Sequence, residues 1–161
     1  MSKDKTLHRT MCEEAAKILH KGGFDCRMGH KYVAIELMTY GNEIPDVWAT
    51  NGWSVSIVEV KTSRSDFLRD KEKKCRQNPS EGIGNFRWYF ALPGIIKEDE
   101  LPDDWGLAEA DETGKYVKLV KIASFQESSS LGSIATLCSI MRREGIKKGI
   151  FNYRKSKSTE K

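Results

Sequence analysis

The chain has 161 residues, of which 39% are hydrophobic and 31% charged, and its formal net charge is +4. That length suits one domain with a sizeable core, and no apolar run approaches the roughly 20 residues of a membrane span. The first residues lack the apolar segment of a signal peptide. The sequence therefore predicts a cytoplasmic protein without membrane contact, with one domain over residues 1–145 and a basic tail over residues 146–161.

The four cysteines give no motif. Cys12, Cys26, Cys75 and Cys138 form no C-x-x-C pair and show no partnered histidine spacing, so the sequence does not predict a zinc site. Without a secretion signal, we expect reduced thiols that serve as small core residues.

Residues 6–21 are predicted to form a helix that Gly22 and Gly23 end. Its apolar stripe, with spacings of three and four residues, contains Glu14, whereas Glu13 lies off the stripe. Two interpretations of Glu14 stay open. It either reaches solvent from the edge of the stripe, or it points at the polar cluster of the hairpin that follows.

Residues 32–38 are predicted to form a strand, and residues 44–61 a hairpin. Two apolar runs flank Asn51-Gly52, the strongest short hairpin signal, because a type I′ turn needs positive φ at both central residues. A two-residue turn pairs Thr50 with Trp53 and Asp46 with Ile57.

This register gathers charged side chains. Strand alternation puts Asp46, Ile57, Glu59 and Lys61 on one face. Asp46 is then diagonal to Glu59, roughly 7–8 Å away, which is close enough for both carboxylates to share one cation. Paired carboxylates at the edge of a core are costly without compensation. A hard ion such as Mg2+, held by carboxylates and water, provides that compensation.

The remaining elements follow from local signals. A helix is expected to begin near Ser63 or Ser65, which are preferred N-cap residues, and to run to Gln77. Further strands are predicted at residues 86–92, 105–110 and 116–123, and a last amphipathic helix at residues 131–143. The helix after the hairpin and the chain beyond residue 142 are rich in Lys and Arg, which indicates either a solvated face or phosphate contact.

The order of helix, strand, hairpin, helix and strand carries Pro45-Asp46 on one hairpin arm and Glu59-Val60-Lys61 on the other. This pattern resembles the PD-(D/E)XK nuclease superfamily. The stretch V-E-V-K-T-S-R-S-D-F-L-R-D, with W-Y-F-A-L-P and P-D-D-W-G-L-A-E-A-D after it, resembles the MmcB-like DNA-repair branch. The resemblance covers residues 7–123. It implies a restriction-endonuclease-like α/β core, with a central mixed β-sheet flanked by helices.

The resemblance also implies a metal site. Asp46, Glu59 and the backbone carbonyl of Val60 are expected to hold Mg2+, with Mn2+ as a substitute. Glu14 matches the helix glutamate that completes the site in many members. Because that assignment rests on its stripe position, Glu13 stays open. The ion would polarise the scissile phosphate and lower the pKa of a bound water.

Lys61 is expected to position or help deprotonate that water and to screen developing charge. Many members add a Lys or Gln from the next helix, for which Lys71, Lys74 and Gln77 are candidates. The full set of expected nucleic-acid contacts is Arg64, Lys71, Lys74, Gln77, Arg142, Arg143, Lys147 and Lys148.

The implied function is metal-dependent hydrolysis of DNA phosphodiester bonds, in DNA repair, recombination or phage DNA processing. Two alternatives stay open. One is a DNA-binding accessory module that has this fold but does not cleave. The other is a protein-interaction domain in which Asp46, Glu59 and Lys61 form only a surface ion pair. With one site per chain, symmetric cutting of a duplex would need a homodimer.

Overall fold

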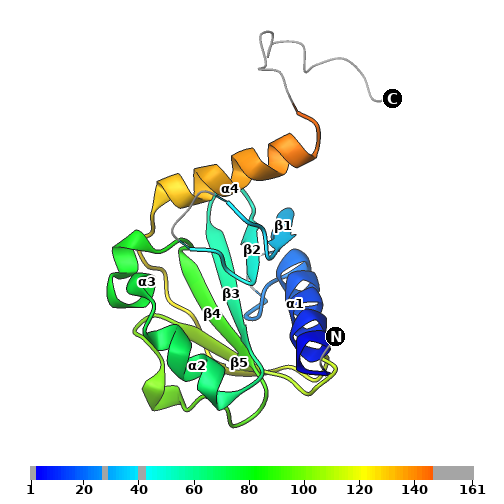
Figure 1. The fold of residues 1–161 in the computed structure, drawn as a ribbon, viewed down its shortest axis with the longest axis vertical. Helices are drawn as coiled ribbons and strands as arrows, with labels where there is room; N and C mark the ends of the chain where they lie inside the picture. The colour runs from blue at the N-terminus through cyan, green and yellow to red at the C-terminus, as the bar shows by residue number, and fades with distance from the viewer. Residues whose placement is uncertain (1–2, 27–28, 40–42, 147–161) are drawn as a thin grey trace.

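The computed structural model describes residues 3–26, 29–39 and 43–146. The fold is α/β, with a six-stranded mixed sheet flanked by helices, as the sequence predicted (Figure 1). The strands are β1 (Tyr32–Ile35), β2 (Val47–Thr50), β3 (Val55–Lys61), β4 (Phe86–Ala91), β5 (Gly106–Glu109) and β6 (Lys118–Lys121). The α-helices are α1 (Lys3–Lys21), α2 (Arg64–Lys71), α3 (Lys74–Gln77) and α4 (Ser130–Arg143), with 3-10 turns η1 (Pro79–Glu81) and η2 (Glu98–Glu100).

The strands lie in the sheet in chain order. β1, β2 and β3 are antiparallel neighbours, β4 and β5 run parallel to β3, and β6 is antiparallel to β5. A parallel pair needs a crossover connection, and α2 and α3 supply it between β3 and β4. They lie on the opposite side of the sheet from α1 (Figure 1).

β3 is buried on both faces, which explains its nearly continuous apolar sequence. On one face, Met11 of α1 packs with Val58 and Val60. On the other face, Phe67 of α2 packs with Ile57. A polar residue on β3 therefore faces a core whichever way it points.

The hairpin between β2 and β3 differs from the predicted register by two residues. Trp48 pairs with Ile57 and Thr50 with Val55, which leaves residues 51–54 as the loop. Gly52 has φ of +93°, whereas Asn51 is not among the described residues with positive φ. Instead, the Asn51 side chain accepts hydrogen bonds from the N–H groups of Trp53 (2.9 Å) and Ser54 (3.0 Å). This Asx-type turn replaces the predicted type I′ turn.

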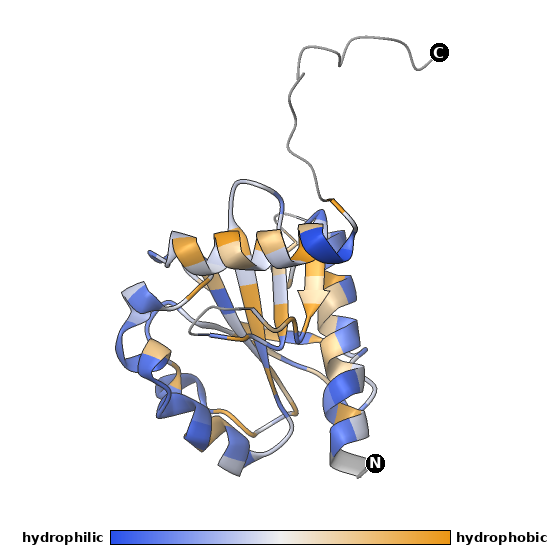
Figure 2. Cartoon of the chain, turned by 45° about the horizontal axis from the view of Figure 1, so that its top comes forward, coloured by the Kyte–Doolittle hydropathy of each residue, from blue (hydrophilic) through white to orange (hydrophobic). Residues whose placement is uncertain are grey.

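The predicted elements are otherwise close to those observed, except that the long helix expected up to Gln77 is broken. α2 ends at Lys71 and α3 starts again at Lys74. The cysteine prediction is half right, because Cys12 and Cys75 are buried thiols but Cys26 and Cys138 are exposed. Figure 2 colours several stretches of α4 as hydrophobic and its C-terminal end as hydrophilic. Within the described residues, no helix combines the length and apolarity that crossing a membrane requires.

The loop conformation makes a prediction about stability. Gly52 has open space where a Cβ would be added, so Gly52→Ala tests backbone conformation alone. A left-handed conformation costs an alanine about 1–2 kcal/mol, and we expect that loss in urea unfolding. Gly22→Ala is the control, because the added Cβ meets only an ordinary contact at 3.8 Å. Equal stability of the two variants would contradict this account of the turn.

Candidate functional site

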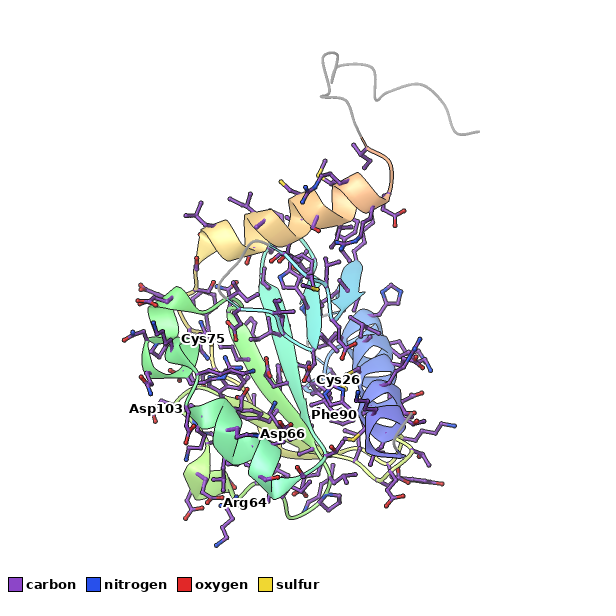
Figure 3. All side chains as sticks on the ribbon, in the orientation of Figure 1. Cys26, Arg64, Asp66, Cys75, Phe90 and Asp103 are labelled. Atoms are coloured by element: carbon purple, nitrogen blue, oxygen red, sulfur yellow. The ribbon has the colours of Figure 1, made fainter. Side chains whose placement is uncertain are left out.

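The carboxyl end of β3 carries two charged side chains into the core. Glu59 is 1% exposed and Lys61 4% exposed. Ser63 follows at once and caps α2, since its Oγ accepts the N–H of Asp66 at 3.3 Å. Because only two residues separate the end of β3 from the start of α2, the helix starts beside the end of the strand. Figure 3 labels Arg64 and Asp66 in the first turn of α2. Of the two predicted N-cap residues, Ser63 is the one used.

Three cations surround the Glu59 carboxylate. Its Oε2 lies 3.2 Å from the ammonium of Lys61 and 3.2 Å from that of Lys73, and its Oε1 lies 3.1 Å from Arg76 Nη2. Burial raises the pKa of Glu59 to about 7, although Lys61 and Arg76 favour its charged form. Burying a carboxylate without such partners would be far more costly.

Asp70 of α2 is a second buried carboxylate that pairs with the same cations as Glu59. It lies 2.6 Å from Lys73 and 2.9 Å from Arg76, and it accepts the Tyr89 hydroxyl at 2.7 Å. Burial opposes ionisation, but Arg76 and Lys61 hold the pKa of Asp70 below its usual range. Asp70 therefore stays charged and keeps both α2 and α3 attached to the sheet.

Arg76 extends the network to a loop far away in the sequence. It pairs with Glu43, whose other oxygen accepts the N–H of Ile83 at 2.8 Å. The buried acid–base cluster thus contains three carboxylates and three cations, namely Glu43, Glu59, Asp70, Lys61, Lys73 and Arg76. A fourth carboxylate, that of the partly exposed Asp66, lies 3.7 Å from the Lys61 ammonium.

Asp46 lies just before β2 and binds the β3 backbone. Its Oδ2 accepts the N–H of Val60 at 2.7 Å and lies 3.4 Å from Nε2 of His8. Burial opposes ionisation, but His8 and Lys61 hold the pKa of Asp46 below its usual value. The β2–β3 register, continued by one residue, sets Asp46 opposite Glu59 rather than diagonal to it. Asp46 and Glu59 therefore both lie near the end of β3 but contact different partners.

The expected glutamate of α1 is elsewhere. Glu14 pairs with Lys17 at 2.7 Å, and its Cβ lies beside Gly114. Glu13, the other candidate, pairs with Arg9 at 3.1 Å. In the described part of the chain, neither belongs to the group of ligating side chains around Asp46. His8 is the α1 side chain that contacts Asp46.

The helix after the motif contributes different residues from those expected. Lys74 and Gln77 are exposed, and the Lys71 ammonium lies 5.6 Å from the centroid of the Phe67 ring. Lys73 and Arg76 contact Glu59 instead. Lys73 lies three residues after Asp70, as neighbours on one helix face do, whereas α3, which begins again at Lys74, places Arg76 on the same two carboxylates, Glu59 and Asp70.

The expected nucleic-acid contacts are spread over the surface. Arg64 is engaged by Glu100 and by the carbonyl of Ile95 at 2.9 Å. Arg142 and Arg143 are exposed and, with Met38, Thr39 and Ser139, line an open hollow of about 480 Å³. Lys147 and Lys148 lie outside the described residues.

Sequence reasoning also missed the contact between two side chains of α1, His8 and Cys12. Cys12 Sγ lies 3.6 Å from Nδ1 of His8, so a histidine partner exists, contrary to the prediction made from the cysteines. The signal was available, because residues four apart share one helix face.

No family model matches this chain. No curated protein matches it either. The chain is similar to a solved structure described as the SPO1766 protein of unknown function from Silicibacter pomeroyi, with 18% sequence identity and a TM-score of 0.49. The similarity covers 74% of this chain and 84% of the other.

The acid–base cluster predicts a large effect for Arg76→Met. Removing Arg76 takes one cation from each of three buried carboxylates, Glu43, Glu59 and Asp70, and breaking a buried ion pair typically costs about 3–5 kcal/mol. Arg69→Met is the matched control, because the Arg69 side chain is 75% exposed and, within the part of the chain that the structure describes, pairs only with Asp66. Such a surface pair is worth at most about 1 kcal/mol. Urea unfolding of both variants measures the difference. Equal losses would mean that the buried network does not stabilise the fold.

Proposed function

We propose that this chain is a metal-dependent nuclease that hydrolyses DNA phosphodiester bonds, in DNA repair, recombination or phage DNA processing. The observation that carries the proposal is that Asp46, Glu59 and Lys61 all lie at the end of β3, where Asp46 accepts the Val60 N–H and Glu59 pairs with Lys61. The resemblance of this motif to the PD-(D/E)XK superfamily supplies the reaction and the substrate class.

The donor set fits a hard divalent ion. Asp46 and Glu59 supply carboxylate oxygens, and Mg2+ commonly binds through one or two carboxylates while keeping several waters. Val60 can add its carbonyl. In an antiparallel ladder, the N–H and C=O of one residue face the same neighbouring strand, and the Val60 N–H faces Asp46. When bound, Mg2+ would polarise the phosphate and lower the pKa of a water.

Lys61 is suited to stabilising charge. Burial disfavours its charged form, but Glu59 and Asp70 raise the pKa of Lys61 above its usual value. A protonated amine cannot accept a proton from water. Of the two roles expected for Lys61, the structure therefore favours orientation of the water and screening of developing negative charge.

One observation favours the alternative, a DNA-binding accessory module that does not cleave. The cluster around Glu59 is already neutralised by Lys61, Lys73 and Arg76. A cation at Glu59 must compete with these groups, of which the half-exposed Lys73 is the most easily displaced. Such a module would bind DNA in a salt-dependent way without metal.

Cleavage of labelled single-stranded, duplex and flap DNA in Mg2+ or Mn2+ tests the proposal. We expect Asp46→Asn and Glu59→Gln each to lower the rate at least about a hundredfold, the usual cost of losing one preorganised electrostatic group. Glu13→Gln is the control, because that carboxylate belongs to an exposed pair on α1.

Wild-type chain that binds DNA in a salt-sensitive manner but cleaves none of these substrates would favour the accessory module. Wild-type chain that neither binds nor cleaves DNA would overturn both readings.

Two adjacent lysines give a second test. Lys73 lies 3.2 Å from Glu59, whereas Lys74 is exposed on α3. Because a nearby cation repels a divalent ion, we expect Lys73→Met to tighten Mn2+ binding about tenfold and Lys74→Met to leave it unchanged. Isothermal calorimetry measures both. Unchanged or weaker binding in Lys73→Met would place the ion away from Glu59.

A further inference from the structure

A second group of ligating side chains lies beside the proposed nuclease site. His8 and Cys12 come from α1, Glu36 follows β1, and Asp46 precedes β2. One ligating atom from each lies within 4.8 Å of all the others. The group combines a thiol and an imidazole with carboxylates, whereas the site proposed for Mg2+ offers oxygen atoms only.

Local structure holds these four residues together. His8 and Cys12 are one helical turn apart and so share a face of α1. Glu36 follows β1 with φ of +45°, and its N–H donates to the Asp46 carbonyl at 2.8 Å. The two carboxylates are therefore linked through the backbone and not only through their charges.

The separations match those around a tetrahedral zinc ion. Nδ1 of His8 lies 3.6 Å from Cys12 Sγ and 3.7 Å from Glu36 Oε1. With Zn–N near 2.0–2.1 Å, Zn–O near 2.0–2.2 Å and Zn–S near 2.3 Å, two ligands of one tetrahedron lie roughly 3.4–3.6 Å apart. The third separation, between the ligating atoms of Cys12 and Glu36, lies within 4.8 Å.

The other imidazole nitrogen has a defined partner. Nε2 of His8 lies 3.4 Å from Asp46 Oδ2. A histidine that ligates a metal commonly donates its second N–H to a carboxylate, which fixes the tautomer and the ring orientation. Asp46 is in place for that role.

We propose that His8, Cys12 and Glu36 bind a thiophilic divalent cation such as Zn2+, with Asp46 orienting His8. Thiolate and imidazole ligands select such ions over Mg2+, and three protein ligands leave a fourth position for water. Cys12 is fully buried, whereas the Glu36 side chain is 60% exposed and gives the ion a path from solvent. On binding, the Cys12 S–H bond breaks, a sulfur–metal bond forms and the proton leaves to solvent.

A simpler explanation of the same geometry is an ion pair. Hydrogen bonding to Asp46 raises the pKa of His8, and a protonated imidazole could serve Asp46 and Glu36 without any metal. That arrangement requires no thiolate. The state of the Cys12 sulfur therefore separates the two explanations.

Co2+ is the probe, because a cobalt–thiolate bond produces a charge-transfer absorption band. We expect the reduced full-length chain to show this band and Cys12→Ser to lose it. Cys75→Ser is the control, since Cys75 is also a buried thiol but lies in α3. We also expect His8→Gln to raise the Co2+ dissociation constant at least about tenfold. His8 is partly exposed, so this variant tests the site even if Cys12→Ser disturbs the core.

Glu59→Gln separates this proposal from the nuclease proposal. It removes a ligand of the Mg2+ site but none of this one, so the cobalt–thiolate band should persist whether or not the chain cleaves DNA. A wild-type chain without the band would overturn the cation site. So would a band that survives in Cys12→Ser, or one that is lost in Glu59→Gln.

Discussion

The burial of Glu59 is the constraint on which the rest of this structure depends. β3 lies between two cores, so a carboxylate near its end cannot reach bulk water. An uncompensated buried charge costs several kcal/mol. Lys61 alone does not provide enough partners, and the additional cations come from Lys73 and Arg76 after α2. The crossover helices are therefore held to the sheet by the side chain that the proposed chemistry uses.

Asp46 connects this cluster to the other half of the molecule. It binds the backbone of β3 at Val60 while its carboxylate faces His8 of α1. Glu59 faces α2 and α3 instead. The end of β3 is thus the place where helices from both sides of the sheet contribute polar groups to one strand. A reaction at this point could use groups from either side without rearranging the fold.

The sequence predicts the parts of this arrangement that depend on local signals. Apolar runs bounded by turn residues identified the strands, and Ser63, one of the two expected N-cap residues, is the cap that α2 uses. The predicted β2–β3 register was wrong by two residues, but each side chain still lies on the predicted face of the sheet, because side chains alternate with a period of two. The break between Lys71 and Lys74 could not be predicted in the same way, since it depends on Asp70 meeting Arg76 and Tyr89 in the folded chain. The pairing of Arg76 with Glu43 joins residues far apart in sequence and has no local signal.

The two proposed cation sites are linked because Asp46 belongs to both. As a ligand for a hard ion, Asp46 acts together with Glu59. As the partner of His8, it orients an imidazole toward Cys12 and Glu36. A cation held by His8 adds positive charge beside Asp46 and keeps that carboxylate ionised. The same charge disfavours a second cation on the opposite side of Asp46 by direct repulsion. Under these two proposals, a thiophilic cation bound by His8, Cys12 and Glu36 would therefore weaken Mg2+ binding at Asp46.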